Sequence, residues 1–178
     1  MNKKELRNII RNKKRQLTTV QLRELSLDVL SKIKNHEMIK TSHHILLYAS
    51  LPDEVNTHDL LDDLLKEGKE VLLPEVIDDY QMRLRVYSGK QDLREGSFHI
   101  MEPIGKIYPE SRYKDIEVGL IPGMSFDKSG NRLGRGKGYY DRLLQKMPHL
   151  YKIGICFDFQ KMERIPIGPY DIAMDEII

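Results

Sequence analysis

The stretch from Asn131 to Asp141 reads NRLGRGKGYYD and has the composition of a loop that binds phosphate. Glycine tolerates positive φ and lets backbone N–H groups approach an anion without a Cβ in the way. Arg132, Arg135 and Lys137 alternate with the glycines and supply positive charge. A glycine turn with a purely structural purpose needs no such alternation, so the pattern favours phosphate binding over a structural turn.

The loop matches neither of the two common nucleotide-binding patterns. A Walker A loop has four residues between its glycines and Ser or Thr after Gly-Lys. Here five residues separate Gly130 from Gly136, and Gly138 follows Lys137. The dinucleotide pattern G-x-G-x-x-G also fails, because the spacing is G-x-G-x-G. The loop is therefore an anion site of another kind.

Positive charge is concentrated in two segments, which we call the basic islands. Residues 1–15 contain seven Lys/Arg and one Glu, and residues 131–146 contain five Lys/Arg and one Asp. Because the whole chain carries only +2, the remainder carries −8. Two short islands suit a small polyanion such as a nucleotide triphosphate, whereas nucleic-acid-binding proteins spread positive charge over a face. Taken alone, the first island is typical of a solvated helix face.

Composition limits the class of protein. The 178 residues are 40% hydrophobic and 31% charged, which predicts one domain, residues 1–178, with its own core. No apolar run reaches 18 residues and no hydrophobic signal centre is evident, so we expect no membrane span and a cytoplasmic location. The single cysteine, Cys156, excludes an internal disulfide and a cysteine-based zinc cluster. Its apolar neighbours predict a buried, unreactive thiol.

Elements that could position the loop follow from periodicity. The expected helices are residues 3–15, a second helix capped by Thr18 and Gln21 with Leu22, Leu25, Val29 and Ile33 on one side, a third capped by Thr57 and ended by Gly68, and residues 139–147. The expected strands are 43–49, 70–74, 82–87 (nearer an edge), 117–122 and 152–157, with residues 88–113 as loops and two helices before any strand.

Strand and helix patterns alternate along the chain. The predicted fold class is therefore α/β: a single domain with a largely parallel sheet, helices on both faces and Rossmann-like layering. The glycine loop follows a strand and precedes a helix. It should lie at the carboxyl end of the sheet, where open α/β folds bind their ligands.

The residues around this loop resemble a known family. The segment PGMSFDKSGNRLGRGKGYYDR is similar to the signature of 5-formyltetrahydrofolate cyclo-ligase, also called 5,10-methenyltetrahydrofolate synthetase. The signature is long and specific, and the chain has no major departure from it. The rest of the family pattern follows in order over nearly the whole chain: Lys3, Leu6 and Arg7, SLPDEVNT with Glu54, the LP of VLLPEV, Glu102-Pro103, Gln160 and Asp171.

The resemblance implies an ATP- and Mg²⁺-dependent ligase that converts 5-formyltetrahydrofolate into 5,10-methenyltetrahydrofolate and releases ADP and phosphate. The γ-phosphoryl group is transferred to the formyl oxygen, the neighbouring amine closes the ring, and phosphate departs. This chemistry requires alignment and charge neutralisation rather than a protein nucleophile, so we expect Arg135 and Lys137 to be catalytic. No Ser/His/Asp or Cys/His constellation is evident, and we interpret His43 and His44 as structural.

The resemblance also assigns residues to ligands. Glu54 would contact folate, although without the resemblance we would favour a solvated turn glutamate. Ala49 and Ser50 would form the pocket wall, and helical spacing favours Tyr140 inward and Tyr139 toward folate. Because Glu54 and the glycine loop are expected at different strand ends, we expect them to serve different ligands. The residues expected to bind ATP are Lys3, Lys4, Arg7, Arg132, Leu133, Gly134, Arg135, Gly136, Lys137, Gly138, Tyr139 and Tyr140.

For the metal, the resemblance favours Asp141 and Asp171 as Mg²⁺ ligands. From position alone, Asp141 could equally be a first-turn acid stabilised by the helix dipole. Two other classes of function stay open on the residues: a small-molecule kinase with an atypical phosphate loop, and an RNA-binding module that uses the basic islands and the tyrosines. The acidic remainder argues against RNA. We expect a monomer whose partners are 5-formyltetrahydrofolate and ATP, with no nucleic acid and no membrane.

Overall fold

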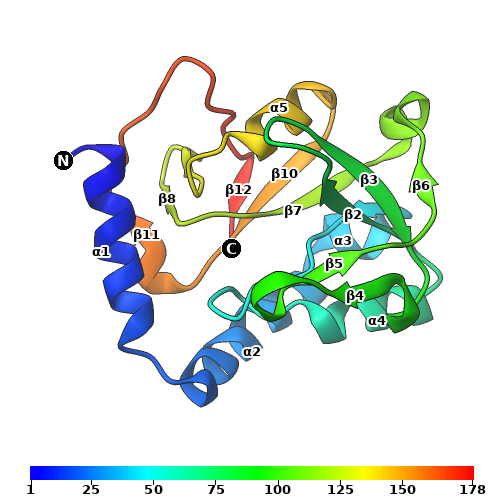
Figure 1. The fold of residues 1–178 in the computed structure, drawn as a ribbon, viewed down its shortest axis with the longest axis horizontal. Helices are drawn as coiled ribbons and strands as arrows, with labels where there is room; N and C mark the ends of the chain where they lie inside the picture. Colours follow the sequence, from blue (N-terminus) through cyan, green and yellow to red (C-terminus); the bar gives the residue numbers. More distant parts are fainter.

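The computed structural model describes residues 1–178, with five α-helices and twelve strands (Figure 1). The helices are α1 (Lys3–Arg15), α2 (Thr19–Asn35), α3 (Glu37–Thr41), α4 (His58–Lys66) and α5 (Tyr139–Gln145). The strands are β1 (His44–Leu46), β2 (Glu70–Val76), β3 (Met82–Tyr87), β4 (Leu93–Glu95), β5 (Met101–Pro103), β6 (Ile107–Tyr108), β7 (Val118–Pro122), β8 (Ser125–Asp127), β9 (Arg132–Leu133), β10 (Tyr151–Ile155), β11 (Lys161–Met162) and β12 (Glu176–Ile177). None of the helices is both long and apolar enough to cross a membrane.

The central sheet has seven strands in the order β12-β10-β7-β1-β2-β3-β6. The strands from β12 to β2 are parallel, and β3 and β6 are antiparallel at one edge. Every residue of β7 is buried, as its continuous apolar run predicts. Only β6 lies outside β3, which confirms that residues 82–87 are close to an edge. The predicted α/β class with a largely parallel sheet is confirmed.

Helices cover both faces of this sheet (Figure 1). Successive side chains of a strand point to opposite faces. In β1, Ile45 packs in the core shared with α2 and α4, whereas Leu46 packs in the core shared with α5. The expected layering is therefore confirmed.

Two connections that leave the sheet on the same side position the candidate site. Strands β1 and β7 are parallel neighbours, with Leu46 opposite Gly119. Consequently the turn after β1, residues 47–57, and the glycine loop after β7 both begin at the carboxyl end of the sheet. Strands β8 and β9 form an antiparallel pair inside the segment leading to the glycine loop, which the sequence did not predict.

Helix α1 lies outside the main layers, beside β8 and β11 (Figure 1). Its two buried apolar residues, Leu6 and Ile10, pack against Met124, Leu133 and Ile165 in a small separate core. Since β8 and β9 carry or adjoin these partners, burial of one helix face holds the first basic island against the glycine loop.

Several local predictions are wrong. Helix α3 is a third helix before the first strand, and residues 88–113 contain β4, β5 and β6. Leu25 is 41% exposed, and Ser26 takes the buried position because its hydroxyl bonds Leu22 O and the Asn56 amide. Thr57 makes no side-chain cap. At Ser26 and Thr57 a contact from outside the helix, with Asn56 and with Tyr48 O respectively, overrides the local pattern.

Candidate active site

Two glycines of the loop have positive φ just before α5. Gly138, the residue before α5, has φ +69°, and Gly136 has φ +120°. An L side chain is strained at both angles, so the backbone path itself requires glycine there. A Cβ at Gly136 would also lie 3.6 Å from Arg7 Cζ, so the loop runs directly beside α1.

Helix α1 is joined to the loop by side chains of the first basic island. Arg7 Nε donates to Gly134 O over 2.8 Å. Lys3 Nζ donates to Asp171 Oδ2, in the segment that follows β11. Lys4 is exposed and makes no hydrogen bond or ion pair with the loop. The two basic islands therefore meet, as expected, through Lys3 and Arg7 but not through Lys4.

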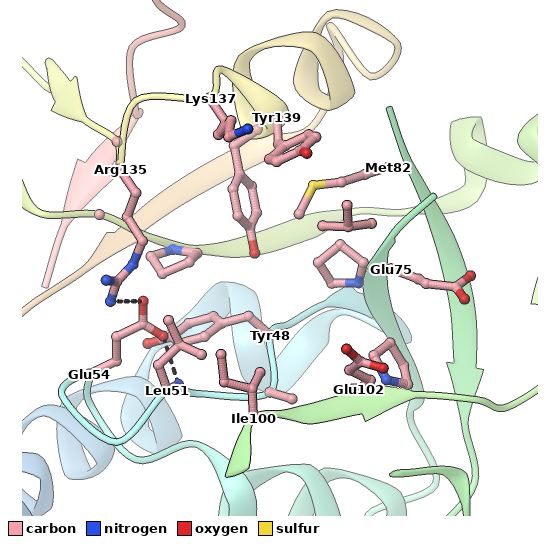
Figure 2. A pocket seen from close by; sticks show the side chains of 18 of the residues that line it. Tyr48, Leu51, Glu54, Glu75, Met82, Ile100, Glu102, Arg135, Lys137 and Tyr139 are labelled. Carbon is pink, nitrogen blue, oxygen red and sulfur yellow. Dashed lines mark hydrogen bonds and ion pairs between the residues drawn. The ribbon is translucent and has the colours of Figure 1, made fainter. Parts of the chain in front are cut away.

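Arg135 joins the loop to the turn after β1. Its Nη2 atom lies 3.0 Å from Glu54 Oε1 (Figure 2). The same atom lies 2.8 Å from Asp53 Oδ1. Glu54 Oε2 in turn accepts from the Leu51 amide over 2.9 Å. Glu54 and the loop do follow different strands, as expected, but β1 and β7 are adjacent and parallel, so the two strand ends meet. A ligand that reaches either group meets both.

Lys14 is part of this cluster and was missed in the sequence. Its side chain is only 3% exposed, and Nζ lies 3.3 Å from Asp53 Oδ2. Burial lowers the pKa of Lys14, and the charge of Asp53 opposes that effect. Burial alone would raise the pKa of Asp53, but Lys14 and Arg135 together hold it below its usual value. Lys14 shares one face of the predicted helix with Arg7 and Ile10, and this spacing was the feature of the sequence that could have identified it.

Lys137 and Tyr139 stand at the opening of the site (Figure 2). Lys137 is 65% exposed, and its nearest carboxylate is the fully exposed Asp79 at 3.8 Å. Tyr139 donates its hydroxyl to Asp78 O over 2.9 Å. Lys137 is thus the loop cation with the weakest competition from protein carboxylates, and Tyr139 is tied to the β2–β3 turn.

Arg132 is buried beneath the loop rather than open to solvent. Nη1 donates to Pro122 O over 3.0 Å, Nη2 lies 3.6 Å from Asp141 Oδ1, and the guanidinium is 5.3 Å from the Tyr140 ring centroid. Burial lowers the pKa of Arg132, and Asp141 offsets part of that effect. The Nε atom of Arg132 is buried without a partner. Asp141 Oδ1 also accepts a hydrogen bond from the backbone N–H of Ile172.

A cavity of about 500 Å³ opens between the glycine loop, the turn after β1, the β2–β3 hairpin and β5. Cavities of this size hold small organic ligands. Glu54, Arg135 and Lys137 supply charge, and Glu75, although in the wall, is paired with Arg83 and Arg85. Much of the remaining wall is apolar: Tyr48, Ala49, Leu51, Pro74, Val76, Met82, Ile100, Met101 and Pro103.

Only some of the residues expected at a ligand site line the cavity. Ala49, Gly134, Gly138 and both tyrosines of the loop line it. Ser50 does not, because its hydroxyl accepts from the Thr57 amide and holds the turn. Leu133 does not either, because it packs in the small core with α1. Strands β2 and β3 were predicted but their place in the cavity wall was not, and β5 was missed because residues 88–113 were interpreted as loops.

The histidines and the cysteine stay outside the site. His44 pairs with Glu70, and no cluster of three or more His, Cys, Asp or Glu side chains could hold a metal. Cys156 is buried, and burial raises its thiol pKa to about 12. The predicted burial of Cys156 is confirmed. The cavity offers the cations Arg132, Arg135 and Lys137, the carboxylates Glu54, Glu75 and Glu102, and an apolar interior, which suits a polyanion beside a flat heterocycle with a polar edge.

Comparisons with known proteins agree with this reading. The sequence profile of the 5-formyltetrahydrofolate cyclo-ligase family matches residues 1–178. The 5-formyltetrahydrofolate cyclo-ligase of Mus musculus is 30% identical, over 99% of this chain and 92% of the relative. That of Escherichia coli strain K12 is 29% identical, over 96% of each.

Solved structures give the same answer. The NMR structure of Aquifex aeolicus 5,10-methenyltetrahydrofolate synthetase has a TM-score of 0.84 and 36% identity, and the match covers 99% of this chain and 89% of that one. A 5,10-methenyltetrahydrofolate synthetase from Mycoplasma pneumoniae has a TM-score of 0.78 and 29% identity, over 100% and 98%. The chain belongs to the 5-formyltetrahydrofolate cyclo-ligase family.

Proposed function

We propose that the cavity beneath the glycine loop is where this chain converts 5-formyltetrahydrofolate into 5,10-methenyltetrahydrofolate, with ATP consumed. Family membership carries the reaction itself. The observation that supports the location is the meeting of Arg135 and Lys137 with Glu54 around one largely apolar cavity, whose lining residue Gly134 is bonded by Arg7 of α1.

The chemistry assigns each part of the cavity a task. The formyl oxygen attacks the γ-phosphorus of ATP and ADP leaves; the neighbouring amine then attacks the formyl carbon, and phosphate leaves with the oxygen. Both steps move negative charge through the phosphoryl group, so the loop amides and the cations Arg7, Arg135 and Lys137 bind and orient the triphosphate. The apolar interior receives the folate ring and excludes water from the phosphorylated intermediate.

Asp141 and Asp171 are suitable for Mg²⁺. The amide of Ile172, next to Asp171, donates to Asp141 Oδ1, so the two carboxylates lie in one region. Lys3 contacts Asp171 Oδ2, and Arg132 lies near Asp141 Oδ1. The other oxygen of each carboxylate, Asp171 Oδ1 and Asp141 Oδ2, accepts no hydrogen bond from the protein. Two available carboxylate oxygens are what Mg²⁺ usually takes from a protein. Bound there, the ion would supply charge neutralisation at the phosphates.

We further propose that the chain acts as a cytoplasmic monomer, without nucleic acid or membrane. The support for a monomer is that residues of one chain complete the cavity, and the support against nucleic acid is the charge of −8 outside the basic islands. Sedimentation of the purified protein tests this proposal, and a stable dimer would contradict it.

A coupled assay tests the function. Purified protein with ATP, Mg²⁺ and 5-formyltetrahydrofolate should form ADP and 5,10-methenyltetrahydrofolate in equal amounts, the latter measured by its absorbance. Neither product should form when the folate is omitted. ADP without methenyl absorbance would favour a small-molecule kinase. No ADP under any of these conditions would contradict the proposed function.

A further inference from the structure

Asp53 connects helix α1 to the glycine loop. Its Oδ2 atom lies 3.3 Å from Lys14 Nζ, and its Oδ1 atom accepts a hydrogen bond from Arg135 Nη2 over 2.8 Å. Lys14 belongs to the first basic island and Arg135 to the second. Asp53 is the only carboxylate that forms ion pairs with both islands. One carboxylate therefore links a helix of the small core to a cation of the cavity.

The link approaches the cavity from behind. Arg135 lines the cavity, whereas Asp53 and Lys14 do not. The side chain of Lys14 is buried, so this cation is out of reach of a ligand. Burial alone would raise the pKa of Asp53, but Lys14 and Arg135 hold it below the usual value, so Asp53 is ionised at neutral pH. A fixed anion thus stands behind Arg135 whether the cavity is empty or filled.

Arg135 keeps most of its donors free for a ligand. A guanidinium has five N–H donors, and Arg135 uses only the two on Nη2 within the protein, for Asp53 and for Glu54. The Nε and Nη1 atoms, which carry the other three donors, make no hydrogen bond to the protein. The side chain is 43% exposed, so these donors are accessible. Arg135 is anchored through one nitrogen and open through the other two.

The two carboxylates that anchor Arg135 differ in their relation to the cavity. Glu54 is part of the cavity wall, so a bound ligand competes with Arg135 for this carboxylate (Figure 2). Asp53 lies outside the wall and keeps its contact. An arginine without an anchor loses rotamer freedom when it binds an anion, whereas an anchored one has lost that freedom already. The anchor that lasts through ligand binding is therefore Asp53.

We propose that Asp53, held in place by the buried Lys14, is a positioning residue for ATP binding. It orients Arg135 so that the free Nε and Nη1 donors meet the triphosphate, and it does not touch the nucleotide itself. A purely structural ion pair would contribute to folding and leave ATP binding unchanged. This inference rests on the proposed function, because it takes Arg135 to bind the phosphates.

The test uses the double variant Lys14→Met/Asp53→Asn, which removes one charge of each sign and retains Arg135. Its net charge equals that of wild type, so long-range attraction of ATP is unchanged. Calorimetry measures the dissociation constant of ATP with Mg²⁺ in the absence of folate, and that of a non-hydrolysable ATP analogue in its presence. The double variant should bind both nucleotides about three- to tenfold more weakly, a part of the worth of one charge-assisted hydrogen bond. Lys34→Met/Asp63→Asn, which removes an exposed pair, should bind them as wild type does.

The same two substitutions are then made in Arg135→Ala. Because Asp53 acts through Arg135, they should cause no further loss of nucleotide binding in that background. Thermal unfolding without ligand shows whether each variant is folded. If the double variant does not fold, Asp53→Asn alone, measured below its unfolding temperature, supplies the same comparison.

Two results would overturn the inference: wild-type dissociation constants in the double variant, or an equal further loss in the Arg135→Ala background. Failure of the proposed function is distinguishable from both. If the wild-type protein bound neither nucleotide, the proposed function would fail and the inference with it. Nucleotide binding by wild type with an unaffected double variant would refute the role of Asp53 alone.

Discussion

The buried pair of Lys14 and Asp53 allows a prediction of opposite effects from two substitutions. Asp53 is the only ion-pair partner of Lys14, whose side chain is 3% exposed, whereas Asp53 itself is 38% exposed. Asp53→Asn leaves a buried cation without its carboxylate. Breaking a fully buried pair costs about 3–5 kcal/mol, and the exposure of Asp53 reduces the expectation to about 1–3 kcal/mol.

This loss should be visible as a change in unfolding temperature. A domain of this size shifts by about 2–4 °C per kcal/mol, so Asp53→Asn should unfold about 2–12 °C below wild type at pH 7. Adding Lys14→Met removes the unpaired cation and keeps an apolar stem. The double variant should therefore recover to within about 1 kcal/mol of wild type.

The sign of the pH dependence follows from Lys14. Its pKa in the folded protein is lowered, first by burial, so between that value and the unfolded one the unfolded chain binds more protons. Stability rises with pH across this window, and the deficit of Asp53→Asn should shrink as the pH is raised from 7 toward 10. Calorimetry or circular dichroism at several pH values measures it.

An exposed pair provides the control. Lys34 and Asp63 lie 2.6 Å apart with side chains 47% and 35% exposed, so Asp63→Asn should cost less than about 1 kcal/mol and show no comparable rescue by Lys34→Met. If the Lys14→Met/Asp53→Asn double variant were as unstable as Asp53→Asn alone, Lys14 would not be an unpaired buried cation in the single variant, and the reasoning would be refuted.

Three further predictions concern the loop, the metal and acid stability. Lys137→Ala should lower kcat/KM for ATP about 10- to 100-fold, since its one ion-pair partner, Asp79, is fully exposed and 3.8 Å away, and unchanged ATP kinetics would contradict its role. Asp141→Asn and Asp171→Asn should each raise the Mg²⁺ concentration for half-maximal activity, whereas Asp175→Asn, whose carboxylate is used at β10, should not; a wild-type titration curve for Asp141→Asn would mean that it only caps its helix. Burial would raise the pKa of Asp127, but its amide donors lower it, so the stability that this carboxylate contributes is present above about pH 4 and lost as the pH falls through its folded pKa; urea unfolding of wild type and Asp127→Asn should differ at pH 7 and converge in acid.

The sequence by itself determined the elements and the chemistry of the glycine loop. Apolar runs such as residues 118–122 become buried strands because a strand covered on both faces can expose no polar side chain. Gly136 and Gly138 are readable as glycine-requiring positions of an anion loop, because backbone conformation is a local property. The family signature also lies in contiguous residues, so the reaction could be predicted before any fold was known.

Local boundaries were less well determined, because contacts from elsewhere in the chain decide them. Thr57 has the residue type of a helix cap, but its hydroxyl donates to Tyr48 O across the turn after β1. Ser26 is polar yet buried, because Asn56 supplies a partner for its hydroxyl. Neither partner can be inferred from the spacing of residues within one helix.

Only the tertiary structure decided which charges meet at the site. Arg135 lies on the loop after β7, and Glu54 lies in the turn after β1, more than eighty residues earlier; they meet because β1 and β7 are parallel neighbours in the sheet. Lys14 joins them only because one face of α1 is buried on the same side. Periodicity and propensity act over a few residues, whereas these ion pairs depend on strand order and helix docking, which free energy summed over the whole core selects.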